Sequence, residues 1–301
     1  MSGDDAGGIL DLSPAQAAPF LDAIAADDFA RAVAARAGRP ADDVRRAVAD
    51  IVSEASLALT LLRSVGPFPR RTHFLEVGAG AGVVAGILHA AGANVTAIEP
   101  LIGGFELFAA VRAELVTRVP TTAVELDRRS ACELTPTRDG PFDLIFSVNV
   151  LEHVHPLAAS LDALAAVLAP GGRMLHTCPN YRIPYEPHYA TPLVPLRPGA
   201  TARLRPALAD DPLWQSLNFI TAGDIARFAA RHDLELHFRP GVLADAIERL
   251  ARDPAFARRQ GWAGRIAAAL GRAGAHRWLR ALPPTWLTPM VFELRSTARA
   301  R

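Results

Sequence analysis

Short apolar runs alternate with longer stretches of helical period between residues 73 and 178. An alternation of strand and helix favours a parallel sheet with right-handed crossovers. We therefore predict an α/β fold with a doubly wound, mostly parallel, Rossmann-like sheet. The predicted strands are 73–77, 94–98, 122–126, 142–148 and 172–178, and the predicted helices are 83–92, 104–117 and 157–168.

The segments on either side of this core have different patterns. Residues 1–70 have helical periods, and Ser13-Pro14 is typical of a helix start. We interpret 1–70 as a helical N-terminal cap and 71–301 as the main domain. Its predicted additions are a proline-rich loop or lid at 179–218, a helix at 221–231, a strand at 234–238, a helical insertion at 241–287 and a last strand at 289–295.

A glycine turn follows the first predicted strand. Gly78, Gly80 and Gly82 stand at every second position after Glu76, and Glu99 ends the second strand. Glycine lets a ligand approach the backbone closely, and the N–H groups of the next helix face the same crevice. An acid after the second strand can accept hydrogen bonds from a ribose diol. The turn also fits the dinucleotide fingerprint, so by itself it leaves two kinds of nucleotide site open.

Two further motifs narrow the choice. After the E-x-G-x-G-x-G turn at 76–82 come F-D-x₇-L-E-H-V at 142–154 and L-x-P-G-G at 168–172. Together these resemble the class I S-adenosylmethionine-dependent methyltransferases, and in particular the small-molecule branch that includes ubiquinone-pathway O-methyltransferases. The resemblance covers residues 72–180. It implies that S-adenosyl-L-methionine is the cofactor.

The resemblance also implies the roles of individual residues. Glu76 would lie near the methionine end of the cofactor, and Glu99 would accept the ribose hydroxyls. The usual acid beside the adenine is absent, and Ser130 or Cys132 would substitute for it. The expected cofactor-binding residues are Glu76, Gly78, Ala79, Gly80, Gly82, Glu99, Pro100, Ala131, Cys132, Asn149 and Val150.

Two histidines are candidate catalytic bases. His153 is placed near the active site by the resemblance, and His188 lies in the predicted lid; either could equally be a structural histidine. In some relatives an E-x-x-E-H run ligates a divalent metal, but Asn149 stands in place of the first Glu, so we predict no metal. The lid residues Tyr181, Tyr185 and Glu186 are predicted to bind the acceptor.

Composition limits the function further. The chain of 301 residues has a net charge of +1 and no lysine, which excludes Schiff-base and P-loop lysines and offers nothing for nucleic acid. The two cysteines and the lack of a signal-peptide pattern fit a cytoplasmic protein. We expect a small-molecule or glycan acceptor that is O-methylated. The rivals are an NAD-dependent oxidoreductase and a catalytically silent methyltransferase-like binding protein.

The arginines are unevenly distributed. Residues 249–301 contain eleven Arg but only two acids, Asp253 and Glu293, and Trp262, Trp278 and Trp286 lie among the arginines. This pattern has two interpretations. One is a solvated helical face with a tail, and the other is contact with an anionic substrate or a peripheral membrane surface.

Overall fold

The computed structural model describes residues 8–100, 107–252 and 261–297, with side chains of the last range from residue 264 onward. The chain divides into two compact units. The first contains the described residues up to 150 together with 156–175, and the second contains 151–155 and 176–297.

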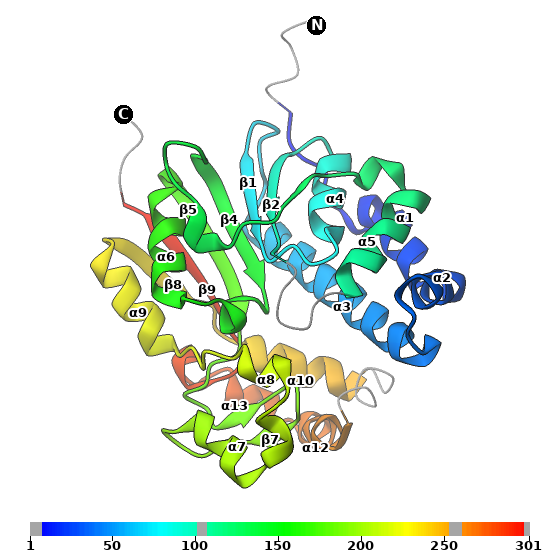
Figure 1. The fold of residues 1–301 in the computed structure, drawn as a ribbon. Coiled ribbons are helices and arrows are strands. Elements are labelled where there is room, and N and C mark those ends of the chain that lie inside the picture. The colour runs from blue at the N-terminus through cyan, green and yellow to red at the C-terminus, as the bar shows by residue number, and fades with distance from the viewer. Residues whose placement is uncertain (1–7, 101–106, 253–260, 298–301) are drawn as a thin grey trace, which may run out of the picture. The chain divides into compact units, whose positions relative to one another are not determined.

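Seven strands form one sheet in the order β3-β2-β1-β4-β5-β9-β8 (Figure 1). β1 pairs in parallel with β2 and with β4, in registers that include His73↔Asn94 and Phe74↔Leu144. Within this sheet β8 and β9 pair antiparallel, with Leu234 opposite Ser296. The sheet confirms the predicted Rossmann-like α/β class.

The first unit starts with three helices. Ser13 accepts the Gln16 N–H at the start of α1, with Pro14 in the first helical position, as the sequence predicts. The long α3 buries an apolar stripe that includes Val44, Val48 and Ile51. The elements of this unit are α1 Pro14–Ala25, α2 Asp27–Ala37, α3 Ala41–Val65, β1 His73–Val77, α4 Val83–Ala90, β2 Asn94–Ile98, α5 Leu107–Arg118, η1 Pro120–Thr122, β3 Leu126–Asp127, η2 Ala131–Glu133, β4 Phe142–Val148, α6 Leu157–Ala166 and the first part of β5 Leu168–Cys178.

The second unit contains the remaining strands and many short elements. Its elements are the end of β5, η3 Leu151–His153, β6 Tyr185–Glu186, β7 Thr191–Pro192, η4 Pro198–Ala200, α7 Thr201–Leu204, η5 Pro206–Leu208, α8 Pro212–Gln215, α9 Ala222–Arg231, β8 Leu234–Phe238, α10 Val242–Arg252, α12 Gly261–Arg272, α13 His276–Leu279, η6 Pro284–Trp286 and β9 Met290–Ser296.

Several predicted elements differ from the structure. The strand predicted at 172–178 already begins at Leu168, and the helix predicted at 157–168 ends at Ala166. The strand predicted at 122–126 is reduced to β3, because Pro120 starts a 3-10 turn that occupies the preceding residues. The segment 179–218 has no long period, yet it is built of a two-stranded ribbon and short helical turns. Its aromatic rings pack in a chain from Tyr181 through Phe219 and Trp214 to Tyr189. The predicted start of the 104–117 helix and residues 253–260 of the insertion lie outside the described residues.

No helix in the part of the chain that the structure describes is long and apolar enough to cross a bilayer.

Candidate active site

The glycine turn sits where β1 ends. Its three glycines have left-handed φ angles, 69° at Gly78, 55° at Gly80 and 74° at Gly82. At Gly78 a Cβ would lie 2.4 Å from Val150 Cγ1, so only glycine lets the turn pass against the residue that follows β4. The turn is tied to β2, because the N–H groups of Gly78 and Ala79 both donate to Ile98 O.

Glu99 is directed onto this turn. Its Oε2 accepts the Gly80 N–H at 2.8 Å, and the side chain is buried. The adjacent Pro100 lies two residues beyond the strand end, as β2 stops at Ile98. A carboxylate that follows the second strand beside the glycine turn suits recognition of a ribose diol. Its role with the cofactor stays a prediction.

Glu76 is a buried acid with an unsatisfied oxygen. Its Oε2 has no hydrogen-bond partner among the described residues. Burial raises the pKa of Glu76 to about 8, and the nearby charge of Glu99 adds to the rise, whereas a hydrogen bond from the Ala85 N–H opposes it. An unpartnered buried carboxyl group is costly unless a ligand cation completes it. The ammonium at the methionine end of S-adenosylmethionine is such a cation, so this residue fits the cofactor.

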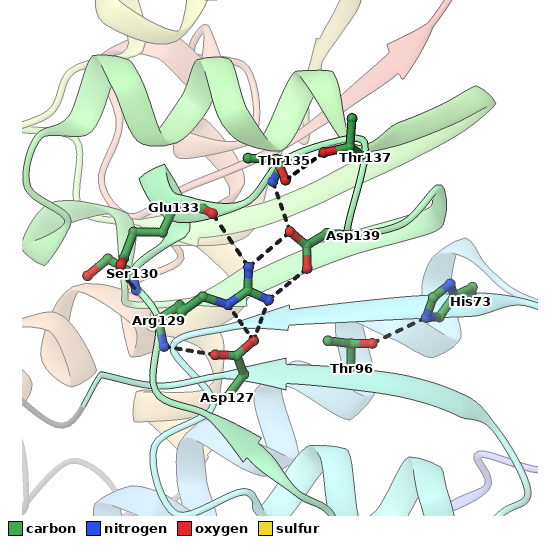
Figure 2. Close-up of polar contacts among 9 residues, drawn as sticks. All are labelled: His73, Thr96, Asp127, Arg129, Ser130, Glu133, Thr135, Thr137 and Asp139. Atoms are coloured by element: carbon green, nitrogen blue, oxygen red, sulfur yellow. Dashed lines mark hydrogen bonds and ion pairs between the residues drawn. The ribbon is translucent and has the colours of Figure 1, made fainter.

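The loop predicted to lie over the adenine is held by an arginine that the sequence analysis did not identify (Figure 2). Arg129 donates to both oxygens of Asp139, at 3.0 and 2.7 Å, and to Asp127 at 2.8 Å. The Arg129 hydrogen bonds hold the pKa of Asp139 at about 2, although its burial opposes the shift. Ser130 and Glu133 cap each other around η2, which carries Ala131 and Cys132. The local sequence contains the Ser130–Glu133 cap, but nothing in it indicates the pairing of Arg129 with Asp139.

Asn149 and Val150 follow β4 in the first unit. Asn149 has a left-handed φ of 53°, and its amide donates to Glu54 Oε1 of α3 at 3.0 Å. Asparagine tolerates this conformation better than most residues. The contact with Glu54 was not predicted, since 95 residues separate the two in the sequence.

The second unit brings both candidate histidines together. The rings of His153 and His188 meet edge to face, with centroids 5.3 Å apart. His153 Nδ1 lies 2.7 Å from Ser216 Oγ, and that hydroxyl donates its proton to Leu213 O. Ser216 therefore accepts from His153, which assigns the proton to Nδ1 and leaves Nε2 as an acceptor. Burial lowers the pKa of His153 to about 3, so its ring is neutral.

His188 is held by a buried carboxylate. Glu186 is fully buried, and its Oε1 lies 2.6 Å from His188 Nδ1. Tyr181 OH and the Tyr189 N–H also donate to Glu186, at 3.2 and 2.8 Å. Burial is the largest single influence and would raise the pKa of Glu186, but the interactions with His188 and the backbone hydrogen bond from Tyr189 together outweigh it, and the pKa is lowered. The ionised carboxylate thus fixes the His188 ring with Nε2 directed away from it.

The predicted acceptor residues differ in their surroundings. Tyr181 is buried and contacts Phe219 and Glu186, whereas Tyr185 is half-buried in the β6–β7 ribbon. Near them, the ligand atoms of Glu152, His153 and His188 lie within 4.8 Å of one another, a grouping that could hold a metal ion. No metal was predicted because Asn149 replaces the first Glu of the E-x-x-E-H run, and nothing in the sequence indicates that the lid brings His188 to Glu152 and His153.

The chain matches known proteins along most of its length. The family model described as a methyltransferase domain matches residues 41–239. An uncharacterized protein of Mycobacterium tuberculosis, Rv1509, is 32% identical over 252 residues, which cover 79% of this chain and 83% of that protein. A ubiquinone biosynthesis O-methyltransferase of Methylocella silvestris is 31% identical over 183 residues, covering 60% of this chain and 65% of the relative.

A solved structure shares the fold. The geranyl diphosphate C-methyltransferase of Streptomyces coelicolor A3(2), crystallised with Mg²⁺, geranyl-S-thiolodiphosphate and S-adenosyl-L-homocysteine, superposes with a TM-score of 0.52. It is 14% identical, and the match covers 84% of this chain and 79% of that one.

The chain belongs to the methyltransferase-domain family. It is a class I S-adenosylmethionine-dependent methyltransferase, which confirms the prediction from the three motifs. The alternative of an NAD-dependent oxidoreductase is set aside by this membership.

Proposed function

We propose that this methyltransferase O-methylates a hydroxyl group of a small molecule or a sugar. The observation that carries the proposal is His188, whose Nδ1 is bound by the buried Glu186, so that Nε2 can accept a proton. A hydroxyl acceptor must lose its proton as the new bond to carbon forms. A histidine oriented by a carboxylate is suited to take it up. The relative from Methylocella silvestris, named as an O-methyltransferase, supports the same choice.

In this proposal, one group of residues holds the methyl donor and another acts on the methyl acceptor. Bound S-adenosylmethionine supplies a methyl group on a sulfonium, which is an excellent leaving group. Glu76, the glycine turn and Glu99 of the first unit would hold it. His188 Nε2 would take up the proton of the acceptor hydroxyl, and bound S-adenosylmethionine would supply the methyl group that replaces it on the oxygen.

His153 would act beside His188 as a neutral hydrogen-bond partner or as a second base. Its Nε2 is an acceptor, because its Nδ1 proton is committed to Ser216. His153 follows the end of β4 by five residues in the sequence. We expect the residues that come directly after β4 to face the transferred methyl.

The test begins with acceptor discovery. Methyl-labelled S-adenosylmethionine and fractionated metabolites would identify a product, and its labelled atom would be assigned by mass spectrometry and NMR. Label on oxygen supports the proposal. Label on nitrogen or carbon contradicts it while leaving the methyltransferase class intact. Cofactor binding without any transfer would favour the catalytically silent alternative.

Substitutions then test the base. We expect His188→Ala to lower kcat by about 10²–10⁴-fold while affinity for S-adenosylhomocysteine stays within twofold. His89→Ala, an exposed histidine on α4, is the matched control. Full turnover in His153→Ala, His188→Ala and the double variant would refute histidine catalysis. Loss of wild-type activity in a chelator, with recovery on adding a divalent cation, would instead show that the histidine cluster holds a metal.

A further inference from the structure

Large apolar side chains are exposed in one stretch of the second unit. Trp278 is 82% exposed and Trp286 is 58% exposed. Three aliphatic side chains from the same stretch are exposed as well, namely Ile266, Leu270 and Leu282. We call residues 264–286 the α12–η6 segment. It contains most of the exposed large hydrophobic residues among those that the structure describes.

The packing of α12 explains why its larger side chains are outside. A Cβ on Gly271 would lie 2.8 Å from Ile247 O of α10, and Ala268 packs against Leu250 of the same helix. The helix thus approaches α10 with its small residues. Ile266 and Leu270, one turn apart, lie on a shared exposed strip instead. Folding of this unit gains little from burying them.

The charge of the segment is of one sign. No Asp or Glu occurs between residues 254 and 292. Arg280 pairs with Asp245 and Glu248 of α10. Among the described residues no carboxylate pairs with Arg265, Arg272 or Arg277, and all three are exposed. A surface that combines arginine with exposed tryptophan and aliphatic side chains matches the interface of an anionic bilayer.

We propose that the α12–η6 segment docks the enzyme peripherally on a membrane surface that contains anionic lipid. Trp278, Trp286 and the exposed aliphatic side chains enter the headgroup region. The arginines contact lipid phosphates. The complete absence of acidic residues favours this occupant over a protein partner, whose surface would usually offer both signs of charge.

The experiment measures binding of the full-length protein to vesicles by co-sedimentation. We expect binding to phosphatidylcholine vesicles with about a third phosphatidylglycerol to be at least tenfold tighter than binding to phosphatidylcholine alone. Raising the salt concentration should weaken it, since the arginine contribution is screened. Tryptophan fluorescence should shift to the blue in wild type and shift less in Trp278→Phe.

Matched variants distinguish vesicle binding by the α12–η6 segment from nonspecific binding. Trp278→Ala/Trp286→Ala and Arg272→Glu/Arg277→Glu should each reduce vesicle affinity at least tenfold. The controls change exposed residues of the same types in the 179–218 segment, Leu196→Ala/Leu204→Ala and Arg203→Glu/Arg205→Glu, and should stay within twofold. Thermal unfolding of every variant verifies the fold.

Three results would overturn the proposal. The first is no preference for anionic vesicles. The second is equal loss of binding in the control and test variants. The third is a self-association that Trp278→Ala/Trp286→Ala abolishes while vesicles are not bound, which would assign the segment to a second copy of the chain.

Discussion

Glu76 should couple cofactor binding to the release of a proton. With a pKa of about 8, it is mostly protonated at pH 6.5 before ligand binds. The ammonium of S-adenosylhomocysteine should favour the ionised form, because an opposite charge nearby stabilises a carboxylate. Binding at pH 6.5 should therefore release about one proton.

The size of the pH effect follows from the fraction of Glu76 that is ionised. For a pKa of about 8, this fraction is about 3% at pH 6.5 and about 24% at pH 7.5. If the ligand binds only when Glu76 is ionised, its affinity should rise about eightfold between pH 6.5 and pH 7.5, which corresponds to about 1.2 kcal/mol of binding free energy. If Glu76 kept the ordinary pKa of a carboxyl group, it would be ionised at both pH values and the affinity would not change between them.

Isothermal titration calorimetry can measure both quantities. At pH 6.5, the observed enthalpy is plotted against the ionisation enthalpy of several buffers, and the slope counts the protons released. We expect about one proton for wild type and none for Glu76→Gln, which keeps the side-chain shape. Glu125→Gln, an exposed acid of the same unit, is the control. A zero slope in wild type, or the wild-type slope in Glu76→Gln, would refute the reasoning.

Three other predictions concern the first unit and the core. Glu99→Ala should weaken S-adenosylhomocysteine about tenfold or more in calorimetry, because ribose hydroxyls would lose their acceptor; unchanged affinity would remove its assigned role. Asp139→Asn should lower the free energy of unfolding by about 1–3 kcal/mol and increase amide exchange in 127–139, while unaltered exchange would mean that the Arg129 pair does not hold the loop. Burial lowers the pKa of His176 to about 3, so the unfolded chain binds a proton more readily and stability should fall as pH drops below about 6.5. Between pH 7 and pH 5 the loss is about 2 kcal/mol, to be measured by urea unfolding, and His176→Leu should lack it.

Much of the fold could be predicted because its signals are local. The boundaries of β1, β2, β4 and β8 agree with the predicted strands, since β1 and β4 are mostly apolar runs and β8 alternates apolar and polar residues, each next to turn residues or polar loops. β3 was harder to place. It pairs only at Ala97 and Ile98 of its neighbour, so little of it is defined by burial.

The lid could not be predicted in the same way. Its prolines indicate turns, but the conformation of the segment depends on contacts between aromatic rings that are distant in sequence, such as Tyr189 with Trp214. No period in the sequence marks such contacts. The ribbon that carries Glu186 has two residues in each strand, too few for any alternation to be recognised.

The residues of the candidate site also differ in how well the sequence predicts them. The expected cofactor residues could be listed from the sequence because they follow consecutive strands of one sheet. The partners that orient side chains could not, because they are remote in sequence: Glu54 for Asn149, and Ser216 for His153. The sequence identifies both histidines as candidates, but the orientation of each ring and the position of its proton depend on a partner of this kind.

Residues 149–153 link the first unit of the chain to the second. Asn149 holds a left-handed backbone through its amide contact with α3, and Val150 packs where Gly78 leaves room for it. The next residues begin the second unit, where Asn218 donates to their main chain. Its N–H donates to Glu152 O, and its side-chain amide donates to Leu151 O and Val154 O. Its Oδ1 in turn accepts the Ile220 N–H. Asn149 is held through its side chain, whereas Leu151, Glu152 and Val154 are held through their main-chain oxygens. The backbone on both sides of His153 is therefore restrained, which limits how far its ring can move from Ser216.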